Sequence, residues 1–152
     1  MTIRVQVDDF DITAEINILK QAAEGEVPGA LVTFTGIVRD FHQGHEIKSM
    51  TLEHYPGMTE RELSRIRKNA MDRWPLGNVT IIHRVGKLNA ADNIVFVGCT
   101  SPHRDAAFEA ARFIMDYLKT DAPFWKAEER DDKISWVDAR EADRASIKKW
   151  ES

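Results

Sequence analysis

Three observations predict an α+β fold with a mostly antiparallel sheet. Short β-branched runs, such as ALVTFTGIV over 30–38 and IVFVGCT over 94–100, predict strands. Two longer segments, 59–74 and 101–120, carry apolar residues at helical spacing and predict two long helices. The remaining strands are short and separated by turn signals, which favours mixed hairpins. The chain contains no interdomain linker, so we expect a single domain over 1–152.

The chain begins with a predicted strand, helix and loop. Apolar residues alternate over 3–7 and predict a short strand. Asp11 or Thr13 can cap the helix that follows. The run GEVPG over 25–29 predicts a loop that leads into the strand at 30–38.

The strand at 30–38 is nearly continuous in apolar and β-branched residues, so we expect it to be buried on much of both faces. Gly36 inside it indicates a bulge or a close approach by the backbone of another segment. The polar segment 39–46 predicts a loop. Residues 47–55 predict the next strand, antiparallel to 30–38.

A helix, two strands and a loop are expected next. Thr59 and Glu62 form a capping box at the start of the helix. Residues 79–85 and 94–100 predict strands, and turn signals over 86–93 predict the loop between them. The C-terminal part is expected to contain a charged loop (128–133), a short strand (134–137) and a helix (142–150).

The stretch from Ser101 to Lys126 carries the residues from which we infer a site. Ser101 can cap a helix, and Pro102 suits the first helical position. Pro123 prevents the helix from continuing, so we expect it to end near Thr120.

Four cationic side chains lie at the two ends of this helix. His103 and Arg104 fall in its first turn, where free backbone N–H groups favour an anion. Lys119 lies in the last turn and Lys126 follows the proline; apolar neighbours are expected to desolvate both amines, which lowers a lysine pKa and suits acid–base chemistry. The alternative is a solvated helix start and two surface lysines. The pattern predicts a local site for a small anion and leaves the reaction open.

Other polar residues offer weaker signals. Arg39 ends the strand at 30–38 and is either solvated or able to clamp an anion bidentately. His42 and His45 have a ligand-like spacing but lack a cysteine or carboxylate set, so we predict no metal site. His54 and His83 lie in predicted strands, which favours hydrogen-bonded structural roles.

Composition excludes several classes of function. The net charge of −4, from 21 Lys+Arg and 25 Asp+Glu, disfavours nucleic-acid binding. No stretch is apolar enough to span a membrane and no signal peptide is recognisable, so we expect a cytoplasmic protein. Cys99 is the only cysteine, which excludes an internal disulfide. Its place in a core strand favours a buried hydrophobe over a nucleophile.

Five segments resemble the large, catalytic subunit family of molybdopterin synthase, in order and over nearly the whole chain. They are VTFTGIVRD (32–40), LEHYPGMTE (52–60), RWPLGNVTIIHRVG (73–86), FVGCTSPHR (96–104) and FIMDYLKTDAPFWK (113–126). The first 28 residues and the loop after Glu128 match weakly.

The resemblance implies an activity, partners and a fold. The family converts cyclic pyranopterin monophosphate into molybdopterin by installing the two dithiolene sulfurs. Sulfur arrives as a thiocarboxylate on the C-terminal Gly-Gly tail of a small ubiquitin-like partner subunit. The expected assembly is a homodimer of this chain with a small subunit at each end, a heterotetramer without a cofactor or metal. The expected fold is α+β with a hammerhead-like β motif.

The resemblance also implies the site residues, and both reactants are anionic, as the cationic site requires. Lys119 is expected to be the main catalytic group, with Lys126 assisting. The residues implied to contact substrate are Ile37, Val38, Arg39, His103, Arg104, Lys119, Lys126, Ala127, Glu128 and Arg140.

A length argument predicts how the two helix ends act together. Arg104 and Lys119 are 15 residues apart, or about 22 Å along a helix axis. We therefore expect His103 and Arg104 of one chain to complete the pocket that holds Lys119 and Lys126 of the other. Two rival hypotheses are a noncatalytic anion-binding or regulatory module of the same fold and a persulfide sulfurtransferase that uses Cys99.

Overall fold

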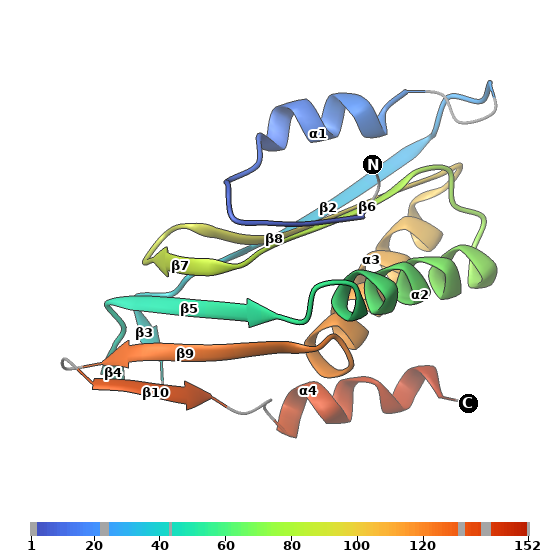
Figure 1. The fold of residues 1–152 in the computed structure, drawn as a ribbon. Coiled ribbons are helices and arrows are strands. Elements are labelled where there is room, and N and C mark those ends of the chain that lie inside the picture. Colours follow the sequence, from blue (N-terminus) through green and yellow to red (C-terminus); the bar gives the residue numbers. More distant parts are fainter. Residues whose placement is uncertain (1–2, 22–24, 43, 131–132, 138–140, 152) are drawn as a thin grey trace.

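The structure is a computed structural model that describes residues 3–21, 25–42, 44–130, 133–137 and 141–151. Two four-stranded sheets lie next to each other, and the longer helices pack on the first (Figure 1). In spatial order, this first sheet contains β1 (Ile3–Gln6), β6 (Val79–Arg84), β8 (Asn93–Ser101) and β2 (Ala30–Ile37). All neighbouring pairs in it are antiparallel except β1 and β6.

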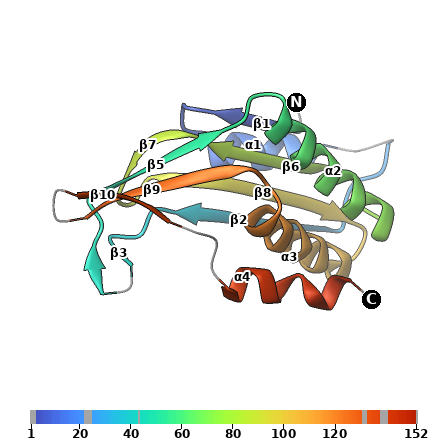
Figure 2. The same cartoon turned by 60° about the horizontal axis from the view of Figure 1, so that its bottom comes forward.

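Helices cover both faces of the first sheet. The helix α1 (Ile12–Leu19) lies on one face, while α2 (Met58–Arg73) and α3 (Arg104–Thr120) lie side by side on the other (Figures 1 and 2). The strand β6 illustrates the result, because its side chains alternate between the two layers: Ile81 packs with α2 and α3, and Ile82 packs with Leu19 of α1. The two expected long, packed helices are therefore present.

The second sheet extends away from the helices and is entirely antiparallel. Its spatial order is β10 (Lys133–Val137), β9 (Phe124–Arg130), β5 (Ser49–His54) and β7 (Gly86–Asn89). Gly86 joins the two sheets, because the chain leaves β6 and enters β7 there with a φ of 91°, which strongly favours glycine. A small hairpin of β3 (Phe41–His42) and β4 (His45–Glu46) precedes β5, and α4 (Glu141–Ser146) follows β10.

Several local expectations are confirmed. Asp11 caps α1 by accepting a hydrogen bond from the backbone N–H of Ala14 at 3.1 Å. The register of β2 against β8 shifts between Gly36 and Ile37, which is the expected bulge. A Cβ on Gly36 would lie 2.7 Å from Cγ1 of Val95, so the close neighbour is a side chain of β8. None of the described helices is both long and apolar enough to cross a membrane.

The start of α3 was predicted wrongly. Ser101 does not cap this helix, because it is the last residue of β8 and pairs with Ala30 of β2. The helix begins at Arg104, with His103 at the N-cap position. It ends at Thr120, as the position of Pro123 predicts.

The start of α2 was also predicted wrongly. The N-cap residue is Gly57 rather than Thr59, and the backbone N–H of Gly57 donates to Oε2 of Glu60 at 3.1 Å, which is the half of a capping box that a glycine permits. The Thr59 hydroxyl instead accepts from the backbone N–H of Tyr55 at 3.1 Å and donates to the carbonyl of Pro123 at 3.0 Å. This residue therefore ties α2 to the turn that follows α3.

Three expectations about the second sheet were wrong. The strand at 47–55 does not pair with 30–38; it is β5, between β7 and β9. The expected loop at 86–93 contains β7, whose single apolar residue, Leu88, is fully buried. The expected charged loop from Glu128 is the second half of β9. Pairing with distant strands overrides weak local patterns in each case.

Candidate active site

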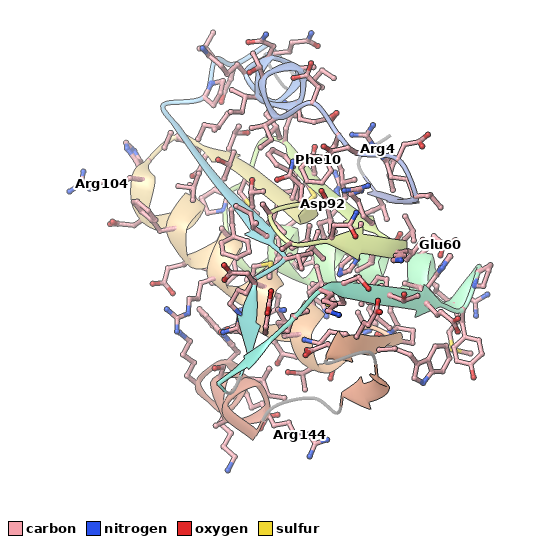
Figure 3. The ribbon with its side chains drawn as sticks, turned by 90° about the vertical axis from the view of Figure 1, so that its left-hand side faces the viewer. Arg4, Phe10, Glu60, Asp92, Arg104 and Arg144 are labelled. Atoms are coloured by element: carbon pink, nitrogen blue, oxygen red, sulfur yellow. The ribbon has the colours of Figure 1, made fainter. Side chains whose placement is uncertain are left out.

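The two ends of α3 present the predicted cations on opposite sides of the chain. His103 and Arg104 are exposed at the N-terminal end, and Figure 3 shows Arg104 pointing away from the body of the protein. Lys119 lies in the last turn, 15 residues after Arg104, and α3 is one uninterrupted helix. The structure therefore separates the two cationic groups by about 22 Å within one chain.

Lys119 is more exposed than the sequence suggested. Its neighbour Leu118 packs into the core, whereas the lysine side chain is exposed in the single chain. Successive helical residues point about 100° apart, so apolar sequence neighbours do not surround the amine. Lys119 is therefore exposed in the single chain although Leu118 beside it is buried.

The turn from α3 into β9 is fixed by α2. Arg65 of α2 forms an ion pair with Asp121 at 3.4 Å, and Thr59 of the same helix binds the Pro123 carbonyl. Because this turn spans only 121–123, β9 begins close to the end of the helix that carries Lys119. The elements that bear the two lysines are thus joined by a short, supported connection.

Lys126 has a buried carboxylate partner. Its Nζ lies 3.3 Å from Oε1 of Glu128, two residues further along β9, and Glu128 is 1% exposed. Side chains two apart on a strand share a face, which allows this contact. A buried carboxylate of this kind orients the ammonium, whose own side chain is 31% exposed and so remains accessible. Ala127 between them is also buried.

Residues 37–39 lie on the same side of the protein as β9. Val38 packs with Met50 and Leu52 of β5, and these two residues are the register partners of Glu128 and Lys126. The residues Ile37, Val38 and Arg39 line an open hollow of about 570 Å³ together with Asp40, Ala90 and Ala91. The fold thus places the end of β2 beside the strand that carries the Lys126–Glu128 pair.

A second hollow, of about 340 Å³, lies at the other end of the first sheet. Pro28, Met71, Leu76 and Pro102 contribute to its lining. None of the residues that the resemblance implies belongs to its lining, although His103 follows Pro102 directly. We therefore place the candidate site near β9 and the end of β2.

His83 is a residue whose position the sequence did not reveal. Its imidazole is buried, and Nδ1 lies 2.8 Å from the carbonyl oxygen of Arg84, so the expected hydrogen-bonded histidine is present. Its ring stacks on Phe124, the first residue of β9, with centroids 3.8 Å apart. Burial, together with the nearby charges of Lys119 and His54, lowers the pKa of His83 to about 4, although the hydrogen bond to the Arg84 carbonyl opposes this shift.

Cys99 shows the features of a structural residue. It is fully buried in β8, and burial raises the pKa of its thiol to about 12. A thiol of this kind is a poor nucleophile at neutral pH.

The remaining candidate residues are the possible metal ligands His42 and His45 and the possible substrate contact Arg140. No group of three or more His, Cys, Asp or Glu side chains that could hold a metal ion occurs among the described residues. His42 and His45 are register partners in the β3–β4 hairpin. Arg140 lies outside the described residues.

An α+β fold with exposed cations at both ends of its central helix is suited to handling small anionic ligands. The family model described as MoaE protein matches residues 5–121, and the chain belongs to this family. A molybdopterin synthase catalytic subunit from Escherichia coli strain K12 is 57% identical over 128 residues, covering 84% of this chain and 85% of that protein. One from Pseudomonas aeruginosa is 51% identical and covers 99% of both chains.

A solved structure agrees with these sequence matches. The molybdopterin biosynthesis MoaE protein from Burkholderia ambifaria MC40-6 superposes with a TM-score of 0.83 at 47% identity, covering 99% of this chain and 98% of that one. The comparisons confirm the resemblance seen in the sequence and the α+β fold class. Membership of this family assigns the chain to the sulfur-transferring enzymes of molybdenum cofactor biosynthesis.

Proposed function

We propose that this chain transfers sulfur to cyclic pyranopterin monophosphate and so forms the dithiolene of molybdopterin. The donor is the C-terminal thiocarboxylate of a small ubiquitin-like partner subunit. The observation that carries the proposal is the Lys126–Glu128 pair, on a strand that begins directly after the helix bearing Lys119. The reaction class follows from family membership, and the Lys126–Glu128 pair indicates where on the protein the reaction takes place.

The reaction proceeds in two equivalent rounds. The thiocarboxylate sulfur attacks a side-chain carbon of the pterin, a C–O bond at that carbon breaks, and the leaving oxygen takes up a proton. The new C–S bond joins the pterin to the acyl group of the partner's tail. Water then attacks the acyl carbon, the acyl C–S bond breaks, and the tail leaves as a carboxylate. A second thiocarboxylated partner repeats the two steps at the neighbouring carbon.

The two lysines act at the reaction steps in which negative charge develops. Lys119 either donates a proton to a leaving oxygen or stabilises the oxyanion of the tetrahedral intermediate. Its exposure in the single chain leaves its ammonium accessible to substrate. Lys126, oriented by Glu128, assists from the adjacent strand.

Binding of the substrate's phosphate requires the arginine side chains. Arg39 follows β2 beside the hollow and holds the phosphate, while Ile37 and Val38 contact the substrate. Arg140 is a further substrate contact that we carry over from the family resemblance.

The far end of α3 acts in a second copy of the chain. Because His103 and Arg104 lie about 22 Å from Lys119, they complete the pocket of a partner protomer. The functional unit is then a homodimer of this chain with two small subunits, and each α3 serves two active sites.

Replacing Lys119 tests the assignment. In a sulfur-transfer assay with the thiocarboxylated small subunit, Lys119→Ala is expected to lower kcat by about 10²–10⁴-fold. Lys68→Ala is the matched control, because Lys68 is an exposed lysine of α2 that pairs with Asp72 at 2.8 Å. Wild-type turnover by Lys119→Ala rules out the assigned role. Binding of the partner by the wild-type chain without any transfer favours the noncatalytic module.

A further inference from the structure

His83 lies where the two sheets and the end of α3 meet. Its side chain is 6% exposed, and its Nδ1 lies 2.8 Å from the Arg84 carbonyl oxygen. A carbonyl oxygen only accepts hydrogen bonds, so Nδ1 carries the proton and donates. This bond fixes the orientation of the ring.

The fixed ring holds the start of β9. His83 and Phe124 stack with ring centroids 3.8 Å apart and an interplanar angle of 19°. This contact joins β6 of the first sheet to β9 of the second, and Lys126 follows Phe124 on the same face of β9. On the other side of Phe124, only the turn at 121–123 separates it from α3. The stack therefore lies at the junction between the elements that bear Lys119 and Lys126.

We propose that His83 is a positioning residue that sets the spacing of Lys119 and Lys126 by holding Phe124 at the junction between them. The inference rests on the proposed function, because the spacing of Lys119 and Lys126 matters for catalysis only if both lysines act in sulfur transfer. The spacing itself is a structural property that can be measured without the reaction. The hydrogen bond from Thr59 to Pro123 supports the preceding turn from α2, and His83 supports the next residue, Phe124, from β6.

The charge of the ring matters as well as its shape. The charged groups that act on it are Lys119 of α3 and His54 of β5, both of which oppose its protonation. The ring is therefore neutral at physiological pH and adds no third positive charge between the two lysines. It is also too weak a base to take a proton from a lysine, which distinguishes a positioning role from acid–base catalysis.

Two substitutions separate stacking from other roles of the side chain. His83→Phe keeps a flat ring against Phe124 and loses the hydrogen bond to Arg84. His83→Leu keeps apolar bulk and loses the stack. His54→Leu is the matched control, because His54 pairs in register with Phe124 but lies outside the stack.

Spacing is measured directly with a short amine-reactive bifunctional reagent. The yield of the intrachain Lys119–Lys126 cross-link is read by mass spectrometry, and mixed labelled and unlabelled chains identify interchain products. His83→Leu is expected to lower this yield, while His83→Phe and His54→Leu match the wild type. Because this readout does not involve sulfur transfer, it stands or falls separately from the proposed reaction.

Kinetics provide the second readout. In His83→Leu, kcat is expected to fall by about 10- to 100-fold with an unchanged KM for the thiocarboxylated subunit, because misplaced groups slow the chemical step. His83→Phe is expected to restore most of kcat. A folded His83→Leu chain with wild-type cross-linking and kcat overturns the inference. A folded His83→Phe chain that has lost either the cross-link or the wild-type kcat also overturns the inference. This test with His83→Phe remains valid even if His83→Leu does not fold.

Discussion

The ammonium of Lys126 lies 3.3 Å from the carboxylate of Glu128, and this carboxylate is almost completely buried. The lysine is partly exposed, so Lys126 is accessible to solvent while Glu128 holds its ammonium from the interior of the protein. Such a pair presents a charged donor in a fixed direction. A lysine without such a partner has no comparable restraint.

Glu128→Gln is expected to weaken both stability and activity. The substitution removes the charge that orients Lys126, and the free energy of unfolding is expected to fall by about 1–3 kcal/mol. Turnover falls because the ammonium loses its fixed direction. Chemical denaturation and the sulfur-transfer assay measure the two effects.

Glu53→Gln provides the control for this substitution, because Glu53 is an exposed glutamate on the adjacent strand β5. It is expected to leave both quantities unchanged. Equal effects of the two substitutions contradict a specific role for the buried carboxylate.

Active sites shared between protomers predict complementation. An Arg104→Ala chain and a Lys119→Ala chain are each expected to be inactive, but a mixed dimer contains one site with both wild-type residues. Random pairing of the two co-expressed chains is expected to restore about a quarter of wild-type activity, because half of the dimers hold one intact site. Sites built within one chain predict no recovery at all, so the assay decides between the two arrangements.

Stability is expected to depend on pH through His83. Its pKa is about 4 in the folded chain and 6.5 in the unfolded chain, so the unfolded state binds more protons between these values. Stability therefore falls as the pH decreases from 6.5 to about 4, by a total of about 3 kcal/mol. Denaturation of the wild type and of His83→Phe at several pH values checks this, because the variant lacks this contribution. Parallel pH profiles contradict it.

Cys99→Ser is expected to retain sulfur transfer. The thiol is buried in β8 and its pKa is about 12, so it does not act as a nucleophile. The buried serine hydroxyl is expected to lower the free energy of unfolding by about 1–3 kcal/mol, so activity is compared at a temperature where both proteins are folded. Loss of transfer by the folded variant favours a persulfide mechanism instead.

Local sequence patterns predicted the elements whose causes are local. The apolar stripe and Pro123 gave the body and the end of α3, and Asp11 gave the cap of α1. The start of α3 was missed because Ser101 is held by pairing with Ala30, 71 positions earlier in the chain. The local sequence around Ser101 is compatible with both a helix N-cap and the end of a strand, and only the pairing with Ala30 distinguishes them.

The residues of the candidate site come from the family resemblance, and the sequence did not indicate how they are arranged. The family resemblance named Lys126 and Glu128, yet the charged run at 128–133 indicated a loop, whereas its first three residues belong to the paired strand β9. The stacking of His83 on Phe124 arises from contact between distant segments. No spacing rule within one segment encodes such contacts.

Reconstitution tests the central claim most directly. The purified wild-type chain is mixed with cyclic pyranopterin monophosphate and the thiocarboxylated small subunit, and mass spectrometry follows both the pterin and the partner's tail. Our account predicts a dithiolene product, with two tails converted from thiocarboxylate to carboxylate for each molecule formed. Binding of the small subunit without dithiolene formation, or product formation without consumption of the thiocarboxylate, contradicts it.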